Sequence, residues 1–234
     1  MDSVRIVNAK EADDQLIQEM FEGYNAAIRL ESDKDTKEEF LEILSSVDDQ
    51  AQFYFAYTKE KGRLVSGTVS VRLWVDGRVY HGIVYAFTNQ SYRKRGLGRA
   101  VIEALLSHYP DECWFCEVLD QKGLSKEEIE EEEVFCGVTC VEREKFWQLM
   151  GFRKVDIDYA NPGLGDENEF GDVIVYNNLW VRTEKNLQWD ALLDGLGAYF
   201  LYEYGGGKTS DRLDRATDYI EKQIAGKSVA FVMP

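Results

Sequence analysis

The stretch that decides the fold is Ser91-Tyr92-Arg93-Lys94-Arg95-Gly96-Leu97-Gly98-Arg99. It follows an apolar, β-rich segment at 82–88 and leads into 97–108, where apolar residues recur with helical spacing. A strand that turns through two glycines into a helix leaves several backbone N–H groups unpaired at one point, and the helix dipole makes that point positive. The pattern therefore predicts an anion site that fits a diphosphate.

The residues of this stretch have separate expected tasks. Gly96 and Gly98 let a ligand approach the backbone because neither has a Cβ atom. The side chains of Arg93, Lys94, Arg95 and Arg99 add positive charge. The alternative is an ordinary strand–turn–helix connection with solvated cations, because short glycine motifs recur by chance.

Composition limits the function further. The 234 residues are 44% hydrophobic and 13% aromatic, which predicts a packed globular protein. A net charge of −16 argues against nucleic acid as a partner and favours amine substrates, although solubility alone also explains it. No stretch is long and apolar enough to span a bilayer, and the first residues lack the pattern of a signal peptide. We therefore expect a cytoplasmic protein without a membrane partner.

The four cysteines allow two interpretations. The pairs Cys113/Cys116 and Cys136/Cys140 have spacings compatible with zinc ligands. Residues 112–119 have the pattern of a strand, however, and positions three apart on a strand face opposite sides. We therefore expect buried reduced thiols and no metal.

Hydrophobic periodicity predicts a chain of mixed strands and helices. Strands are expected at 4–7, 53–57, 64–74, 79–88, 113–119, 153–158, 172–182 and 229–232. Helices are expected at 16–28, 97–108 and 142–150, after the capping-box pairs Thr36/Glu39 and Ser125/Glu128, and twice beyond residue 185.

Two further segments resemble ligand-binding sites, but each has a simpler structural explanation. The run 205–210 (GGGKTS) is similar to a nucleotide-binding P-loop, but Tyr202 stands where that motif needs its first glycine. A helix end followed by a new N-cap is expected there instead. The acidic run 130–133 is expected to be a solvated face, and the alternative is a site for cationic groups of an acceptor.

Three segments resemble the GNAT N-acetyltransferase superfamily. Arg93-x-x-Gly96-x-Gly98, with the entry segment 89–93, resembles the acyl-CoA motif of that family. Residues 146–153 are similar to its FY-x-x-x-GF helix-to-strand block, and residues 158–165 to a Y-x-x-P-x-LG element of one branch. The likeness extends over about residues 3–183.

The resemblance implies an α/β (α+β) fold with a mixed, mostly antiparallel central sheet flanked by helices. It implies a GNAT-like domain at 1–184 and a C-terminal helical extension at 185–234 packed on the same domain. It also implies acetyl-CoA as co-substrate, with the strand end at 87–88 beside the pantetheine arm and the backbone of Thr88 as donor to the thioester oxygen. The implied acetyl-CoA contacts are Phe87, Thr88, Arg93, Lys94, Arg95, Gly96, Leu97, Gly98, Arg99 and Trp147.

The catalytic residues follow less directly, because the sequence departs from the family at two places. Trp147 stands where many members have a tyrosine that acts as general acid, and the strand segment 84–88 has no glutamate. Glu117 on the neighbouring strand is the best-placed base, and the alternative is a solvated glutamate at a strand end. Tyr85 and Tyr159 are candidate acids, and both are equally compatible with a packing role.

The expected function is transfer of an acetyl group from acetyl-CoA to a primary amine, by direct attack in a ternary complex. The acceptor is expected to be a small-molecule or peptide amine, and a polyamine, amino sugar or lysine-like amine matches the negative charge. Whether the chain forms a homodimer stays open. The alternatives are a GNAT-fold module that binds CoA with little turnover and an acidic structural or regulatory protein that binds no CoA.

Overall fold

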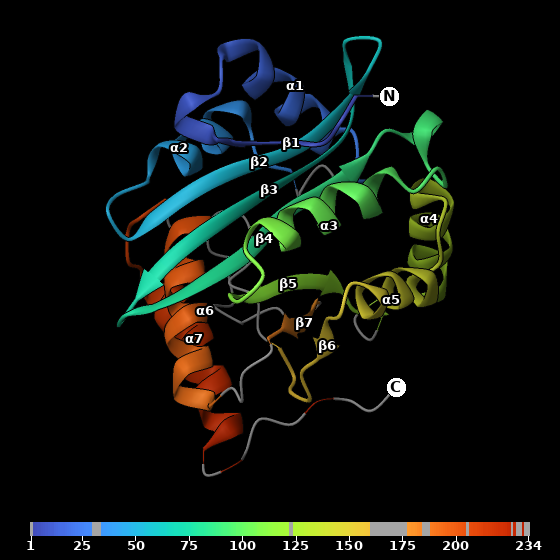
Figure 1. The fold of residues 1–234 in the computed structure, drawn as a ribbon. Coiled ribbons are helices and arrows are strands. Elements are labelled where there is room, and N and C mark those ends of the chain that lie inside the picture. Colours follow the sequence, from blue (N-terminus) through green and yellow to red (C-terminus); the bar gives the residue numbers. More distant parts are fainter. Residues whose placement is uncertain are drawn as a thin grey trace.

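The computed structural model describes residues 2–29, 34–121, 124–159, 177–183, 188–204, 206–225, 227 and 231. In this part of the chain, seven strands form one sheet in the order β1-β2-β3-β4-β5-β7-β6 (Figure 1). Strands β4 and β5 run parallel, and the other neighbours run antiparallel. The strands are β1 (Arg5–Asn8), β2 (Ala51–Glu60), β3 (Arg63–Val75), β4 (Arg78–Thr88), β5 (Cys113–Leu119), β6 (Arg153–Lys154) and β7 (Asn177–Arg182).

Helices cover both faces of this sheet, which confirms the predicted fold class. Figure 1 shows α3 in front of the sheet and α6 and α7 behind it. The described α-helices are α1 (Asp14–Asn25), α2 (Lys37–Ser45), α3 (Leu97–His108), α4 (Lys126–Cys136), α5 (Cys140–Leu149), α6 (Trp189–Glu203) and α7 (Asp211–Ile224).

Two apolar cores, one on each face of the sheet, hold the layers together. Side chains of α1, α2, α6 and α7 pack on one face, around residues such as Phe55. Side chains of α3 and α5 pack on the other face, around residues such as Val101. Successive residues of β5 belong to opposite cores, Phe115 to the first and Cys116 to the second, because side chains alternate along a strand.

Helix α6 lies so close to the sheet that the contact requires glycine on both sides. A Cβ atom at Gly82 of β4 would lie 2.4 Å from the ring of Tyr199 on α6. A Cβ atom at Gly195 of α6 would lie 2.7 Å from the ring of Tyr80 on β4. Helix α6 therefore packs directly against β4.

Local signals predicted most element boundaries correctly. The capping boxes Thr36/Glu39 and Ser125/Glu128 begin α2 and α4. After α6, Gly206 and Gly207 have positive φ angles, and Ser210 caps α7 through a bond to the amide of residue 213. The glycine run is therefore a helix end and a new helix start, as expected.

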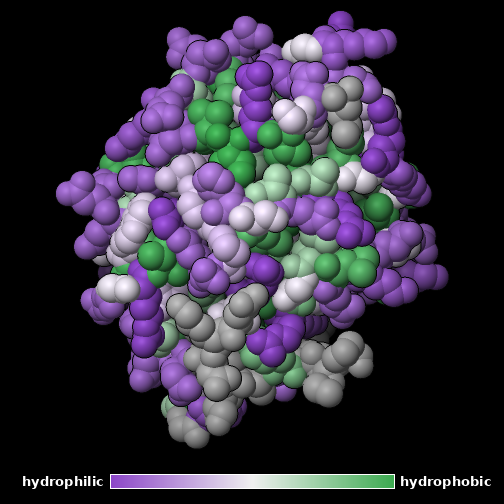
Figure 2. Space-filling model, in the orientation of Figure 1, coloured by the Kyte–Doolittle hydropathy of each residue, from purple (hydrophilic) through white to green (hydrophobic). Residues whose placement is uncertain are grey.

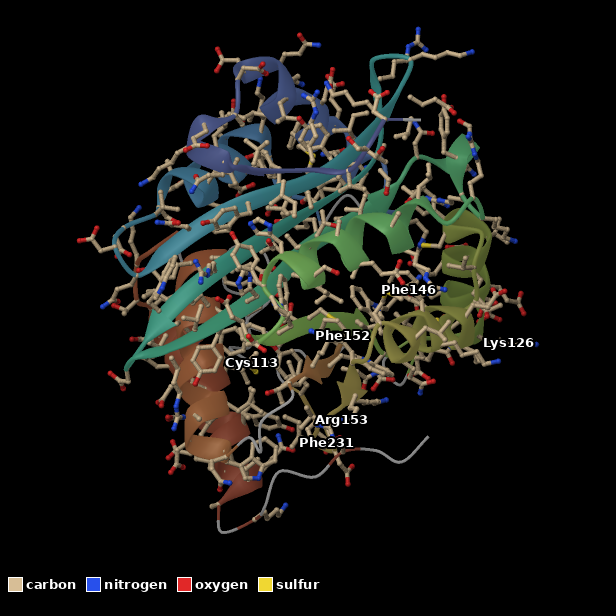
Figure 3. The ribbon with its side chains drawn as sticks, in the orientation of Figure 1. Cys113, Lys126, Phe146, Phe152, Arg153 and Phe231 are labelled. Carbon is tan, nitrogen blue, oxygen red and sulfur yellow. The ribbon has the colours of Figure 1, made fainter. Side chains whose placement is uncertain are left out.

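Three expectations differ from the structure. Helix α1 ends at Asn25, three residues before the predicted end, and a Thr139/Glu142 capping box that the sequence analysis missed begins α5. Strand β6 spans only 153–154; Val155 then donates a hydrogen bond to the carbonyl oxygen of Leu179 in β7 and forms an isolated bridge with Phe231. Arg153 and Phe231 lie side by side in Figure 3, with the guanidinium carbon 3.9 Å from the ring centroid. The predicted strand segments 172–176, 229–230 and 232 and the element at 160–165 lie outside the described residues.

Hydrophilic side chains cover most of the face drawn in Figure 2, in agreement with the net charge of −16. None of the helices that the structure describes is long and apolar enough to cross a membrane.

Two alanine substitutions on α6 test its packing against β4. Gly195→Ala should destabilise the protein by about 1–3 kcal/mol, because the new methyl group would overlap the Tyr80 ring. Gly197→Ala is the matched control: no atom lies within 4 Å of its Cβ position, so the better helix propensity should stabilise by up to about 1 kcal/mol. Chemical denaturation measures both, and equal effects of the two substitutions would contradict this packing.

Candidate active site

Strands β4 and β5 separate part-way along their length. Their parallel pairing ends at Ile83 and Cys116, although β4 continues to Thr88 and β5 continues to Leu119. The facing backbone edges beyond the last pair are therefore open to a further extended chain.

A β-bulge in β4 accompanies the separation. Val69 of β3 pairs with Tyr85, and Ser70 pairs with Ile83, so Val84 is the extra residue. Because side chains alternate along a strand, one inserted residue reverses the faces of all residues that follow. Tyr85 consequently packs in the core beside α1 and α6, on the face that also holds Glu117 of β5.

The loop after β4 leads into α3 with free backbone amides. Gly96 precedes the helix with a φ angle of 75° and provides no capping side chain. Among the described residues, no hydrogen-bond acceptor contacts the amides of 94–99. By contrast, side-chain oxygens cap α1, α2, α4, α5 and α7. The start of α3 is therefore able to bind an anion.

The two glycines of the loop have different structural tasks. Gly96 adopts a left-handed conformation that favours glycine, and nothing lies within 4 Å of its Cβ position. A Cβ atom at Gly98 would lie 3.1 Å from the hydroxyl of Thr88, so Gly98 allows the helix start to lie against the end of β4. Leu97 is buried between them and anchors the helix.

Three of the four cations of the loop already contact protein groups. Arg93 donates from Nη1 to the carbonyl oxygens of Phe135 and Cys136, at 2.8 and 2.6 Å, at the C-terminal end of α4. Arg95 lies 2.9 Å from Glu60, and Arg99 lies 2.8 Å from Glu103. The backbone amides, rather than these guanidinium groups, are thus the donors presented to a ligand.

A cavity of about 650 Å³ joins the start of α3 to the gap between β4 and β5. Gly96 and Gly98 line it at the loop, and Tyr24, Tyr85 and Glu117 line it at the sheet. Helices α4 and α5 supply a further wall, where Figure 3 shows Phe146.

Charge pairs connect α4 to the elements around the cavity. Glu132 lies 3.0 Å from Arg143 of α5 and 3.4 Å from Arg29, which follows α1. Glu131 lies 2.9 Å from Arg29. The expectation of a purely solvated acidic face at 130–133 is therefore wrong for Glu132, whose side chain is 14% exposed, whereas that of Glu131 is 66% exposed as expected.

Glu117 has two phenol donors. Its carboxylate accepts hydrogen bonds from the hydroxyl groups of Tyr159 and Tyr204. Burial raises the pKa of Glu117 to about 7, and the two hydrogen bonds oppose a larger rise. The alternative of a solvated glutamate at a strand end is therefore wrong.

A second carboxyl group lies beside the stacked rings of Tyr24 and Tyr85, whose centroids are 3.9 Å apart. Asp35 accepts a hydrogen bond of 2.8 Å from Tyr24 and another from Tyr85. Burial raises the pKa of Asp35 above its ordinary value. The pKa of Tyr85 is raised by burial and by Asp35, so this phenol keeps its proton.

A third carboxyl group comes from the C-terminal extension. Glu203 of α6 is 7% exposed. Burial raises its pKa far above the ordinary value, and the charges of Glu117 and Asp35 add to the rise. Of these three carboxyl groups with raised pKa values, Glu117 lines the cavity.

Comparisons with known proteins identify the domain. Residues 15–123 match the model of the Acetyltransferase (GNAT) family. This segment is a GNAT acetyltransferase domain.

Two solved structures support the same fold. A GNAT-family protein from Bacteroides thetaiotaomicron superposes with a TM-score of 0.58 and 15% identity, over 89% of this chain and 100% of its own. A tandem GNAT protein from the clavulanic acid biosynthesis pathway superposes with a TM-score of 0.51 and 16% identity, over 71% of this chain and 53% of its own. A comparison with curated proteins finds no match.

The structure also locates the remaining predicted site residues. Trp147 lines the cavity from α5, with its ring centroid 5.1 Å from those of Phe146 and Phe152. Phe87 lines the cavity, and its ring fills the space above Gly23 and Gly67, on the α1 side of the sheet. Tyr159 is 1% exposed and reaches the site through Glu117.

Sequence reasoning missed Asp35 and Tyr204, which form hydrogen bonds with residues that line the cavity, and it missed the buried acid Glu203. Asp35 lies directly before the capping box of α2, where an acid is unremarkable in sequence. Glu203 did carry a signal, because it continues the helical spacing of Leu196, Tyr199 and Phe200 on the buried side of α6. A glutamate in such an apolar stripe indicates a buried acid.

Cys113, Cys116 and His81 contact packing partners in the protein interior. Cys113 packs in one core and Cys116 in the other, so they face opposite sides of β5 as predicted. His81 is buried, contacts Glu112 and stacks on Trp114, 4.0 Å between ring centroids. The described residues contain no group of three or more His, Cys, Asp or Glu side chains that could hold a metal ion.

Replacement of Glu117 tests its environment through stability. The pKa of Glu117 is about 7 in the folded protein and 4.5 in the unfolded chain. The free energy of unfolding therefore falls as the pH rises from about 4.5 to about 7, because the folded state resists ionisation of this group. Glu117→Gln should therefore stabilise the protein by about 1–3 kcal/mol above pH ~8 and have little effect near pH ~5. Denaturation at both pH values measures this, with exposed Glu221→Gln of α7 as control. A stabilisation independent of pH would show that Glu117 does not titrate in this range.

Proposed function

We propose that this protein is an N-acetyltransferase that moves an acetyl group from acetyl-CoA to a primary amine. The observation that carries the proposal is a single cavity that contains both the free amides at the start of α3 and the carboxyl group of Glu117. One end suits a diphosphate, and the other suits an amine that must lose a proton.

The groups around the cavity fit the parts of acetyl-CoA. The amides of 94–99 would hold the diphosphate, and the open edges of β4 and β5 would accept the amide groups of the pantetheine arm. When bound, acetyl-CoA supplies an acyl group that is already activated as a thioester. The protein then has to bind both substrates, align them and remove a proton.

Glu117 is the proposed general base. A pKa of about 7 leaves a large fraction ionised at neutral pH and still allows the group to accept a proton. Tyr159 and Tyr204 would act as positioning residues, because the hydroxyl group of each donates a hydrogen bond to Glu117. Tyr85 donates to Asp35 in the same way, so we propose positioning roles for Tyr85 and Tyr159 in place of general acid catalysis.

The thiol groups in the cavity are protonated, which favours direct attack by the amine over an acyl-enzyme intermediate. Cys116 and Cys136 line the cavity, and burial raises the pKa of both, that of Cys136 to about 11. Few thiolate anions exist at such sites at neutral pH, so neither is suited to form an acyl-enzyme.

The backbone next to the thioester oxygen can come from the β4 bulge at Val84 or from Thr88, and the strand register favours the bulge. Glu117 follows Cys116, the partner of Ile83, so it lies level with Val84. Thr88 lies four residues further along, ~13 Å at the usual rise of a strand. We therefore propose the backbone around Val84 and Tyr85 as the group that faces the reacting carbonyl.

A CoA-binding module with little turnover is the second candidate. Trp147 replaces the expected tyrosine, and the phenols of Tyr85 and Tyr159 both donate to carboxyl groups instead of facing a leaving thiolate. A thiolate leaves without an acid, however, so these features lower the rate without excluding transfer.

An assay with acetyl-CoA and a panel of primary amines distinguishes the two candidates. The enzyme should release CoA thiol and form the acetylated amine, with a rate that rises with pH around an apparent pKa of about 7. Glu117→Gln should lower kcat by about 10²–10⁴-fold. Tight binding of acetyl-CoA without transfer to any amine would favour the binding module.

Loss of one phenol donor tests the positioning role. Tyr204→Phe should raise the apparent pKa of the rate profile by roughly half a unit to one unit, since a hydrogen bond that lowered the pKa of Glu117 is removed. Tyr219→Phe on α7 is the control, because Tyr219 lies at the surface. An unchanged profile in Tyr204→Phe would show that Tyr204 does not act on the base.

Gly98→Asp tests the diphosphate site. A carboxylate at the start of α3 would repel the diphosphate and occupy the free amides, so acetyl-CoA affinity should fall by about 100-fold or more. Gly77→Asp in the β3–β4 turn adds the same charge far from the site and should leave affinity unchanged. Isothermal titration calorimetry measures both, and full affinity in Gly98→Asp would refute the assigned site.

A further inference from the structure

Helix α4 lacks the apolar packing that holds the other helices in place. None of its eleven residues is buried, and none belongs to either apolar core. Each of the other described α-helices buries at least two side chains. Because most helices in proteins are fixed by an apolar face, the position of α4 depends on polar contacts to an unusual degree.

Arg93 makes the polar contact at the C-terminal end of α4. Its Nη1 atom donates to the carbonyl oxygens of Phe135 and Cys136, at 2.8 and 2.6 Å, and its Nε atom donates to the carbonyl oxygen of Thr88, at 3.2 Å. The last carbonyl groups of a helix have no partner within the helix and form the negative end of its dipole, so a guanidinium group suits them. One side chain thus joins the end of β4 to the end of α4.

Glu132 supplies the other strong contacts of α4. Its carboxylate lies 3.0 Å from Arg143 of α5 and 3.4 Å from Arg29, which follows α1. Helices α1 and α5 pack on opposite faces of the sheet. Helix α4 therefore bridges the two outer layers, on the side of the molecule toward which β5 runs (Figure 1).

Helix α4 forms a wall of the cavity between β4 and β5. Glu132 and Cys136 line the cavity from the helix, Leu124 lines it just before, and Val138 lines it just after. In the proposed complex the diphosphate lies at the amides of 94–99, and the pantetheine arm continues from there into the gap between the strands. The arm is thus the part of acetyl-CoA that passes along the wall formed by α4.

We propose that Arg93 is a positioning residue, whose guanidinium group holds α4 against the pantetheine arm of acetyl-CoA instead of binding the phosphates. This inference rests on the proposed function, since it uses the same acetyl-CoA site. It also assigns a function to the acidic helix α4, which encloses the arm once the loop before α3 holds the diphosphate.

Two ligands that differ by the arm test the proposal. Acetyl-CoA is compared with adenosine 3′-phosphate 5′-diphosphate, which has the phosphates of CoA but no pantetheine arm. Arg93→Ala should weaken acetyl-CoA binding by about tenfold or more and nucleotide binding by less than about threefold, because only the arm loses its contact with α4. Isothermal titration calorimetry of the full-length protein measures both affinities.

A second variant loosens α4 through its other contacts. Glu132→Gln leaves the loop before α3 intact but weakens the pairs with Arg29 and Arg143, so it should also weaken acetyl-CoA binding and spare the nucleotide. Arg215→Ala removes an exposed arginine of α7 outside the cavity lining and should change neither affinity. Thermal unfolding shows whether each variant is folded.

Hydrogen exchange in the protein without ligand tests the contact between Arg93 and α4 by itself. The amides of 130–136 should exchange about tenfold faster in Arg93→Ala, because the end of the helix loses charged hydrogen bonds. The amides in the middle of α3 should exchange at the rate of the unmodified protein.

The outcomes separate this inference from the proposed function. Equal weakening of both ligands, full acetyl-CoA affinity, or unchanged exchange of α4 in Arg93→Ala would overturn the positioning role. Selective loss of acetyl-CoA affinity in a protein that acetylates no amine would support the positioning role and refute the transferase function. A protein that binds no acetyl-CoA at all would overturn both.

Discussion

The end of pairing between β4 and β5 at Ile83 and Cys116 is the constraint on which the rest of the site depends. Beyond that point the two strands enclose a cavity instead of a ladder of hydrogen bonds. The bulge at Val84 sits at the same level and reverses the alternation of β4. Tyr85 therefore turns toward Asp35 and Glu117 instead of toward α3, and the strand end delivers the loop to the start of α3. The separation of the strands and the bulge thus lie at the same level of the sheet, where one opens the cavity and the other turns Tyr85 toward Asp35.

The acids at the sheet end are tuned by burial and by phenols. Glu117, Asp35 and Glu203 all have raised pKa values, because burial disfavours their ionised forms. Tyrosine hydroxyls hold the first two in place without adding a compensating charge. Of the three, Glu117 titrates near neutral pH and lines the cavity, which fits its proposed role as a general base. Helix α6 contributes to this environment, since Tyr204 directly after it donates a hydrogen bond to Glu117.

The parts that could be predicted from sequence are those that local chemistry determines. The start of α3 follows from Gly96 and Gly98, and the starts of α2 and α4 follow from their capping boxes. Asp35 and Tyr204 could not be assigned, because their role arises only when distant segments pack against β4 and β5. The side chain of Arg93 was expected to add charge for the ligand, yet it binds the end of α4, a helix whose position the sequence does not reveal.

A crystal structure of the protein with bound acetyl-CoA would test the central claim most directly, because it locates both ends of the ligand at once. The account predicts diphosphate oxygens within hydrogen-bond distance of the amides of 94–99, and the thioester between Val84 and Glu117. Acetyl-CoA bound elsewhere, or β4 and β5 paired as far as Thr88 around an empty site, would contradict it.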